Sequence, residues 1–210
     1  MIKFWRGRAV QRVIFALLGL VLALGLSVIP AFSQTPPNPF RVATEATFPP
    51  FEFQQGGQLT GFDIDLMRAI GEEADLNIDF RNLPFDGIIP ALQARTVEAA
   101  ISGMTITAER AQAISFSRPY FKAGLAIAVR EDNKTIKNFE DLKGKRIAVQ
   151  IGTTGALEAI KIPGSVVSQF DSAALALQEL INGRVDAVVN DKPVTLYAIN
   201  LACLRGVQVV

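Results

Sequence analysis

The chain has 210 residues, of which 50% are hydrophobic, so it can bury one sizeable core or two modest ones. It contains no histidine and a single cysteine, which excludes an intramolecular disulfide, paired cysteine ligands for a metal and histidine-based catalysis. Residues 1–34 carry four basic residues and no acid, whereas residues 35–210 carry 17 basic and 20 acidic residues. This balance provides no basic surface for nucleic acid.

The first 34 residues have the composition of an export signal. A basic segment, "MIKFWRGRAVQR", precedes the uncharged stretch Val13–Ile29, and small residues follow at Ala31 and Ser33. The uncharged stretch is short for a bilayer span, which needs about 20 residues. Residues 1–34 are therefore predicted to be a signal peptide, with a retained N-terminal anchor as the alternative. In both cases we expect the rest of the chain to work in the periplasm or another extracytoplasmic space.

Residues 35–39, "TPPNP", predict a stiff polar leader, and strand-like and helix-like segments alternate after it. The first series predicts strands at "RVATEA", "NIDFRNL" and "EAAISG", and helices at "GFDIDLMRAIGEEADL" and "FDGIIPALQARTV", the latter with Asp86 as its N-cap. The strand "LAIAVRE" leads into a second series. It predicts strands at "KRIAVQ", "VVSQF", "AVVND" and "VQVV", and helices at "TGALEAI", "SAALALQELING" (capped by Asp171) and "PVTLYAINL". Two such series predict an α/β protein with two lobes.

Ligands of open α/β sheets gather at the carboxyl ends of the strands, so the segments that follow the strands are informative. In the first series these segments are "TFPPFEF", "PFDG" and "SGMTITAER", and in the second "IGTTG" and Asp191. They contain aromatic rings, hydroxyls, glycines, one arginine and carboxylates. They contain no nucleophile beside a base, no metal cluster and no phosphate-binding loop, so they predict a binding site and no cofactor or metal.

The residues "ATEATFPPFEF", "GFDIDL", "FDGIIPAL", "ISGMTITAERAQAISFSRPYF", "LKGKRIAVQIGTTG" and "GRVDAVVND" resemble, in this order, the family 3 solute-binding proteins of bacterial importers. Among these receptors for polar amino acids the chain is most similar to the glutamine-binding proteins. The resemblance extends from about Phe40 to Val210. It implies the type II periplasmic binding protein fold, in which two lobes close around a ligand.

The resemblance also implies a role for individual residues. Arg110 would bind the α-carboxylate of an amino acid, because a guanidinium can form two parallel hydrogen bonds with a carboxylate. Asp191 would receive the α-ammonium group. Other contacts to these two groups would come from Ser102, Gly103 and Thr105. The ligand side chain would lie between the rings of Phe48 and Phe85. The loop of the second lobe would contain Thr153 and Thr154, at a helix N-terminus.

The sequence departs from the glutamine-receptor pattern at three positions. Glu45 stands where an aspartate is usual, Gln150 where a lysine is expected, and Asn190 where a histidine is expected. Other roles also remain open for the candidates: Arg110 on an exposed helical turn, Phe48 and Phe51 in a core, and Asp191 as a helix cap. We expect Glu45 and Gln150 to line the site, where they bear on the identity of the ligand.

The function implied is that of a monomeric receptor, not an enzyme, that binds a polar or basic L-amino acid such as glutamine or arginine for a membrane ABC permease. One alternative is the ligand-binding module of a permease fusion, or of a membrane sensor or channel. Another is a secreted dehydratase of the cyclohexadienyl type on the same fold, with Glu45 as the acid.

The same resemblance implies a domain organisation. Residues 40–123 are expected to form most of lobe 1 and residues 124–210 lobe 2, with the crossing between them near Phe121–Leu125. In the family the chain then returns to complete lobe 1. No residues remain here for that return, so we expect lobe 1 to be incomplete and to expose apolar surface.

Overall fold

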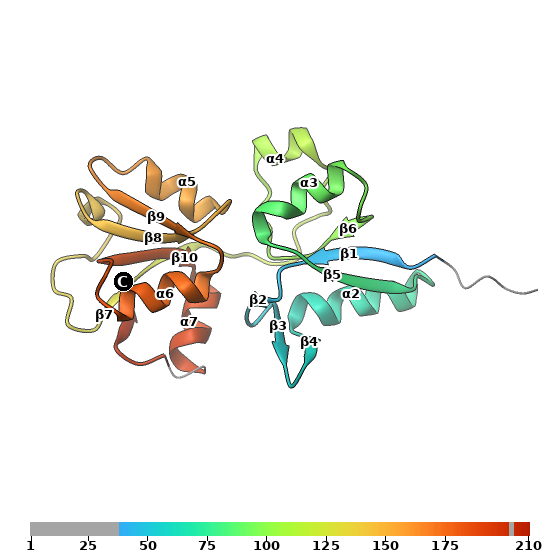
Figure 1. The fold of residues 1–210 in the computed structure, drawn as a ribbon, viewed down its shortest axis with the longest axis horizontal. Coiled ribbons are helices and arrows are strands. Elements are labelled where there is room, and N and C mark those ends of the chain that lie inside the picture. The colour runs from blue at the N-terminus through green and yellow to red at the C-terminus, as the bar shows by residue number, and fades with distance from the viewer. Residues whose placement is uncertain (1–37, 202–203) are drawn as a thin grey trace, which may run out of the picture. The chain divides into compact units, whose positions relative to one another are not determined.

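The computed structural model describes residues 38–201 and 204–210. The predicted signal peptide and residues 35–37 of the leader lie outside these residues. Within the described part, no helix is both long enough and apolar enough to cross a membrane. Residues Asn38–Val210 form one unit that contains two separate α/β layers (Figure 1).

The first α/β layer is a short parallel sheet with helices on both faces (Figure 1). Neighbouring residues of a strand point to opposite faces, and here Val42 packs with Met67 of one helix while Ala43 packs with Ile88 of another. The strand order is β5-β1-β6. The elements are β1 (Phe40–Thr44), β5 (Ile78–Asn82), β6 (Ala99–Ala100), α2 (Phe62–Glu73), the 3₁₀ turn η1 (Phe85–Gly87), α3 (Ile88–Gln93) and α4 (Ala108–Ala113).

A small antiparallel sheet, which the sequence analysis did not predict, lies between β1 and α2 in the chain. Its strands are β2 (Thr47–Phe48), β3 (Glu52–Gln55) and β4 (Gln58–Thr60). The turn between β3 and β4 consists of Gly56 and Gly57, both with positive φ, as a two-residue hairpin turn requires. The strands are too short to give a clear alternation in the sequence.

The second α/β layer is a five-stranded mixed sheet in the order β11-β7-β10-β8-β9 (Figure 1). Strands β8, β9 and β10 are parallel, whereas β7 and β11 run antiparallel to their neighbours. One face packs on α5 and the other on α6, α7. The elements are β7 (Leu125–Arg130), η2 (Glu140–Leu142), β8 (Arg146–Gln150), α5 (Thr154–Ile160), β9 (Val166–Phe170), α6 (Ala173–Ile181), β10 (Ala187–Asp191), α7 (Lys192–Asn200) and β11 (Val207–Val209).

Two predicted helix caps are wrong. Asp86 lies inside η1, and α3 starts after Gly87 with no side-chain cap. Asp171 lies one position too early, because Ser172 has the extended backbone of an N-cap and accepts a hydrogen bond from the Leu175 N–H. Helix α4 was not predicted at all. Its N-cap is Thr107, whose hydroxyl accepts from the Arg110 N–H.

Residues 114–124 connect the two layers and run past the first layer. Phe121 of this segment packs edge-on against Phe51, with ring centroids 4.9 Å apart, and also contacts Phe62. A cavity of about 650 Å³ lies beside the segment, at the edge of the first sheet where β6 has no further neighbour among the described strands. Its lining includes Ile101 and Phe116.

Candidate functional site

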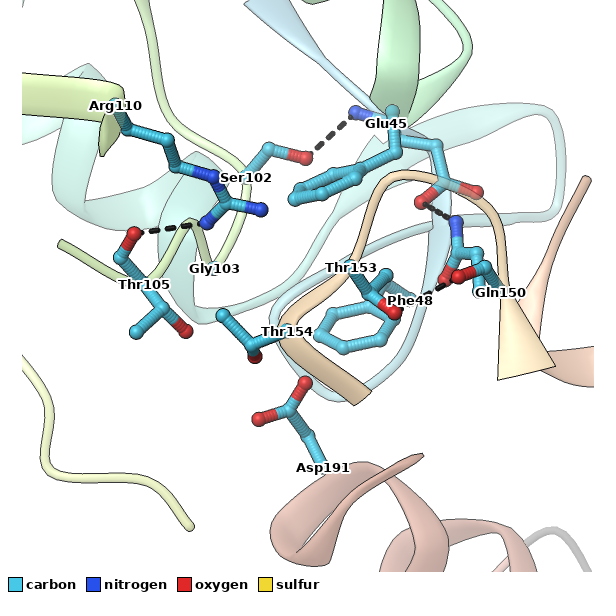
Figure 2. Close-up of a pocket in the computed structure, with 11 residues that line it drawn as sticks. Glu45, Phe48, Ser102, Gly103, Thr105, Arg110, Gln150, Thr153, Thr154 and Asp191 are labelled. Carbon is cyan, nitrogen blue, oxygen red and sulfur yellow. Dashed lines mark hydrogen bonds between the residues drawn. The ribbon is translucent and has the colours of Figure 1, made fainter. Parts of the chain in front are cut away.

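All the residues predicted to bind a ligand line one pocket in the structure (Figure 2). They lie at the carboxyl ends of β1, β5, β6, β8 and β10 or in the segments that follow these ends, where a ligand was expected. The lining residues leave a cavity of only about 10 Å³, well below the roughly 300–1,000 Å³ of ligand sites, so a ligand would have to displace some of their contacts. Its eleven lining residues are Glu45, Phe48, Phe85, Ser102, Gly103, Thr105, Arg110, Gln150, Thr153, Thr154 and Asp191.

Arg110 is the buried cation of this pocket. It lies in the first turn of α4 and is only 9% exposed, so it is not on an exposed helical turn. Its Nη1 donates to the Thr105 carbonyl at 2.8 Å, and its Nη2 donates to the Gly152 carbonyl at 2.9 Å. Burial lowers the pKa of Arg110, while Glu109 and Asp191 raise it, but an arginine keeps its charge in proteins.

The Arg110 contacts leave its charge only partly compensated. Both partners are neutral carbonyls, and the Phe85 ring lies 5.5 Å from the guanidinium carbon. A carboxylate would be a stronger partner for the same donors, because charge-assisted hydrogen bonds are roughly twice as strong as neutral ones. An incoming carboxylate that displaced the Gly152 carbonyl would therefore gain from the exchange.

Glu45 and Gln150 form a hydrogen-bonded pair at another part of the pocket (Figure 2). The Gln150 Nε2 donates to Glu45 Oε2 at 2.7 Å, and the Thr47 hydroxyl donates to the other Glu45 oxygen. Burial raises the pKa of Glu45, with a smaller contribution from Asp86, whereas the two donors lower it. Both side chains are buried, so this pair offers a polar partner with little water around it.

Asp191 provides a second acidic group. It is the N-cap residue of α7, but its side chain makes no capping hydrogen bond, so the capping role considered from the sequence is not seen. Burial raises the pKa of Asp191 to about 6, and the charge of Arg110 opposes this shift. Its carboxylate projects toward Thr154 in Figure 2 and is available to a cation.

Ser102 and Gly103 form the loop that faces the pocket after β6. The Ser102 hydroxyl accepts from the Glu45 N–H at 3.0 Å and donates to Glu52 Oε1 at 2.8 Å, so it is committed within the protein. Gly103 has a φ of 54°, and a Cβ there would lie 3.2 Å from the Phe48 ring. The glycine therefore lets the loop pass close to the aromatic wall.

The threonines of the second layer have different roles. The Thr153 hydroxyl donates to the Gln150 carbonyl at 2.8 Å and accepts from the Ala156 N–H, so it caps α5. Thr154 is the first residue of α5, and no side-chain hydrogen bond engages it in the part of the chain that the structure describes. Of the two, Thr154 has the freer hydroxyl for a ligand.

The aromatic residue Phe48 belongs both to the pocket and to an apolar cluster. With Phe51 it packs against Ala173 of α6 and Val194 of α7, which belong to the second layer. The alternative of a core position is therefore correct for Phe51, which does not line this pocket. Phe48 has both roles, since it is buried and also forms a wall of the site.

The arrangement suits a small zwitterion. A buried cation and an acid of opposite charge line the same pocket, two rings flank it, and a buried polar pair lies at another side. Among the lining residues there is no cysteine or histidine, and the Ser102 and Thr153 hydroxyls donate to the Glu52 carboxyl group and to the Gln150 carbonyl, respectively. Within the described residues, no three acidic or sulfur side chains lie where they could hold a metal ion.

Sequence reasoning missed two parts of the surroundings. The Gly152 carbonyl accepts a hydrogen bond from Arg110, whereas the sequence predicted only that the loop "IGTTG" lies at the site. Glu52 and Asp63 lie directly behind the loop at Ser102 and Gly103. Their motifs, "PFEF" and "GFDIDL", were quoted for the resemblance, but nothing in the sequence placed the two carboxyl groups together.

Residues 40–200 match the family described as bacterial extracellular solute-binding proteins, family 3. The chain belongs to this family. The chain has the two-lobe periplasmic binding protein fold, as the resemblance implied.

The relatives are named as binding proteins for amino acids. The chain is 38% identical to the putative ABC transporter arginine-binding protein 2 of Escherichia coli (strain K12), over 78% of this chain and 68% of that protein. It is 48% identical, with a TM-score of 0.78, to an ancestral arginine-binding protein solved with arginine, over 81% of this chain and 77% of the other. An ancestral arginine-binding protein solved with glutamine is 49% identical, with a TM-score of 0.77, over 81% of this chain and 77% of the other.

One solved relative has a link to an enzyme. It is described as an ancestral amino acid-binding protein that is a precursor of cyclohexadienyl dehydratase. It is 45% identical to this chain, with a TM-score of 0.77, over 81% of this chain and 76% of the other.

Proposed function

We propose that this protein is the extracytoplasmic receptor of an ABC importer and that it binds a basic or neutral polar L-amino acid, arginine or glutamine. The observation that carries the proposal is that a buried cation, Arg110, and an acid, Asp191, line the same small pocket. The relatives named for arginine, and the structures with arginine or glutamine, support the same ligand class.

In this proposal Arg110 binds the α-carboxylate in place of the Gly152 carbonyl, and Asp191 binds the α-ammonium group. Phe48 and Phe85 enclose the aliphatic part of the ligand. Its distal amide or guanidinium group reaches Glu45, which can accept from either. No bond is made or broken, so the protein acts by capture and not as an enzyme.

The proposed cycle uses two lobes, residues 40–123 and 124–210, that close on the ligand. Hydrogen bonds from Arg110 to Gly152 and from Gln150 to Glu45 already join the two layers in the structure, and a ligand would take over or extend them. We propose a monomer that is exported by residues 1–34 and recognised by its permease when closed.

Titration calorimetry tests the proposal. The wild-type chain is expected to bind arginine or glutamine, whereas Arg110→Ala should bind at least tenfold more weakly. A charge-assisted hydrogen bond contributes about 1.5–3 kcal/mol, and each tenfold change in the dissociation constant corresponds to about 1.4 kcal/mol. The matched control is Arg184→Ala, which removes an exposed arginine paired with Glu179. Binding by Arg110→Ala within threefold of wild type would contradict the assignment.

The ligand series in the same experiment tests the role of Glu45. Glutamate should bind at least about tenfold more weakly than glutamine, because its distal carboxylate would meet Glu45 and find no cation among the lining residues other than Arg110. Equal binding of glutamate would show that the distal group lies elsewhere.

A dehydratase is the second candidate, and it is favoured by the raised pKa of buried Glu45 and by the relative that is a precursor of such an enzyme. Turnover of a prephenate-like acid, lost in Glu45→Gln, would replace the receptor proposal. Absence of turnover together with amino-acid binding would favour the receptor.

A further inference from the structure

Two carboxyl groups lie buried side by side behind the loop that faces the ligand pocket. Glu52 on β3 and Asp63 in the first turn of α2 are both 0% exposed. One oxygen of each has protein partners: Glu52 Oε1 accepts from the Ser102 hydroxyl at 2.8 Å, and Asp63 Oδ2 accepts from the Gly103 N–H at 2.9 Å. The other oxygens, Glu52 Oε2 and Asp63 Oδ1, are buried without a hydrogen-bond partner from the rest of the protein.

A single proton between the two groups would satisfy both of these oxygens. Buried polar atoms are almost always hydrogen-bonded, and two adjacent buried carboxylates cannot both stay ionised at low cost. Burial and, to a smaller extent, the negative charge of Asp63 together raise the pKa of Glu52 to about 10. Asp63 is the better place for the charge, because the Gly103 N–H and the Tyr120 hydroxyl both donate to it.

The pair also joins two functional segments. Through Ser102 and Gly103 it contacts the loop that lines the pocket, and Ser102 in turn accepts from the Glu45 N–H. Through the Tyr120 hydroxyl, which lies 2.8 Å from Asp63, it holds the segment that connects the two layers. The ligand loop and the connecting segment are therefore fixed by the same two carboxyl groups.

We propose that Glu52 and Asp63 share one proton and act as a positioning pair that sets the ligand loop at Ser102–Gly103 and anchors Tyr120 of the connecting segment. Neither group touches the ligand. The part that concerns binding rests on the proposed receptor function, whereas the shared proton does not. The titratable groups that face the pair are Glu45, whose charge raises the pKa of Glu52 further, and Tyr120, which serves as a donor.

The shared proton predicts a pH dependence of stability without any ligand. The folded-state pKa of Glu52, about 10, is above the ordinary value of 4.5 for a glutamate, so its contribution to stability is complete below about pH 4.5 and is lost as the pH rises through about 10. One such proton changes the unfolding equilibrium constant up to about tenfold per pH unit. In Glu52→Gln, a neutral amide replaces the protonated acid and this dependence disappears.

The first experiment is urea unfolding of the full chain between pH 5.5 and 9. The control variant is Glu72→Gln, which changes an exposed glutamate of α2. We expect the unfolding equilibrium constants of wild type and of this control to rise with pH by up to about tenfold per pH unit more than that of Glu52→Gln. Parallel pH profiles of wild type and Glu52→Gln would overturn the shared proton.

A spectroscopic measurement keeps the proposal testable if Glu52→Gln does not fold. At pH 8 the infrared spectrum of the wild-type protein should contain the carbonyl stretch of a protonated carboxyl group. The band should persist in Glu45→Gln, which removes the other buried glutamate of the site. Its absence in either protein would overturn the proposal.

The positioning role is tested by arginine binding at pH 7. Glu52→Gln should bind within about threefold of wild type, whereas Glu52→Ala, which removes the acceptor of Ser102, should bind at least tenfold more weakly. Wild-type affinity in Glu52→Ala would refute the positioning role. If the wild-type chain binds no amino acid at all, the receptor function fails, and the unfolding and infrared results still decide the shared proton.

Discussion

Asp191 and Arg110 place opposite charges at one pocket, and burial affects them unequally. Arginine stays charged under all ordinary conditions, whereas burial raises the pKa of Asp191 to about 6. The acid is thus the group whose charge changes near neutral pH. As the pH falls, a ligand held by both residues should therefore lose the charge of Asp191 and not that of Arg110.

Binding of glutamine should weaken as the pH falls below about 6, because protonated Asp191 cannot pair with an ammonium group. The loss should approach about tenfold per pH unit on the acid side of that pKa. Calorimetry from pH 7.5 to pH 5 measures it. Asp191→Asn should bind more weakly at pH 7.5 and should have a flatter pH profile; an unchanged profile in that variant would assign the titration to another group.

The Ser102 and Thr153 hydroxyls illustrate the limit of reading single residues from a motif. Both line the pocket as predicted, yet each hydroxyl is engaged within the protein, one with Glu52 and one with the Gln150 carbonyl. Ser102 and Glu52 are separated by 50 residues in the chain. Sequence neighbours could not have revealed this contact.

Secondary structure elements were predictable where their pattern was long and regular. Strands β7, β8 and β10 contain apolar runs, and α6 has a continuous apolar face, so each was located from the sequence. The short strands β2 to β4 and the helix α4 were missed, because each of these strands has a single apolar residue and the apolar residues of α4 are all alanines, which gives no clear period.

The cap of α6 offers a test at this level. Ser172→Ala should lower the free energy of unfolding by about 0.5–2 kcal/mol, because the hydroxyl accepts from the Leu175 N–H, whereas Asp171→Ala, the cap predicted from the sequence, should change it by less than about 0.5 kcal/mol. Urea unfolding at pH 7 compares the two variants. A larger loss in Asp171→Ala would reverse the assignment.

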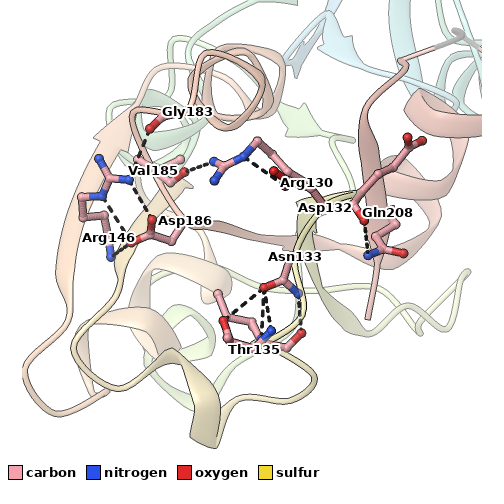
Figure 3. A network of polar contacts seen from close by, with 11 residues as sticks. Arg130, Asp132, Asn133, Thr135, Arg146, Gly183, Val185, Asp186 and Gln208 are labelled. Carbon is pink, nitrogen blue, oxygen red and sulfur yellow. Dashed lines mark hydrogen bonds and ion pairs between the residues drawn. The ribbon is translucent and has the colours of Figure 1, made fainter.

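Polar contacts join the inner strands of the second sheet at one end of the sheet (Figure 3). Arg146 at the start of β8 pairs with Asp186 at 2.7 Å and donates to the Gly183 carbonyl, and Arg130 at the end of β7 donates to the Val185 carbonyl. The Arg146 pair is partly exposed, so it contributes little, about 0–1 kcal/mol. The stability of this sheet comes instead from its two apolar faces.

The complete molecule depends on contacts between its two layers. Two hydrogen bonds join the layers, from Arg110 to the Gly152 carbonyl and from Gln150 to Glu45. In addition, the first layer packs through Phe48 and Phe51 on Ala173 and Val194 of the second. A ligand that contacts Arg110 on one side and Asp191 on the other would add to these contacts and would stabilise both layers together.

Arginine or glutamine at about 100 times its dissociation constant should raise the free energy of unfolding by about 2.7 kcal/mol, because the ligand binds only the folded protein. Thermal unfolding should show one transition that shifts as a whole. Arg110→Ala should show a smaller shift at the same ligand concentration, about 1.4 kcal/mol if its binding is tenfold weaker and less if it is weaker still. A shift confined to part of a two-step transition would mean that the ligand contacts one layer only.

Local pattern and residue order determined the α/β class, the two series of elements and the family, since periodicity and motif spacing are properties of neighbouring residues. The resemblance to the family then pointed to the eleven residues that the structure gathers around the pocket. Tertiary structure alone decided how these residues are used: that Arg110 reaches Gly152, that Gln150 pairs with Glu45, and that Glu52 lies against Asp63. Burial and long-range contact set the charge of these groups, and neither is encoded within any one segment of the chain.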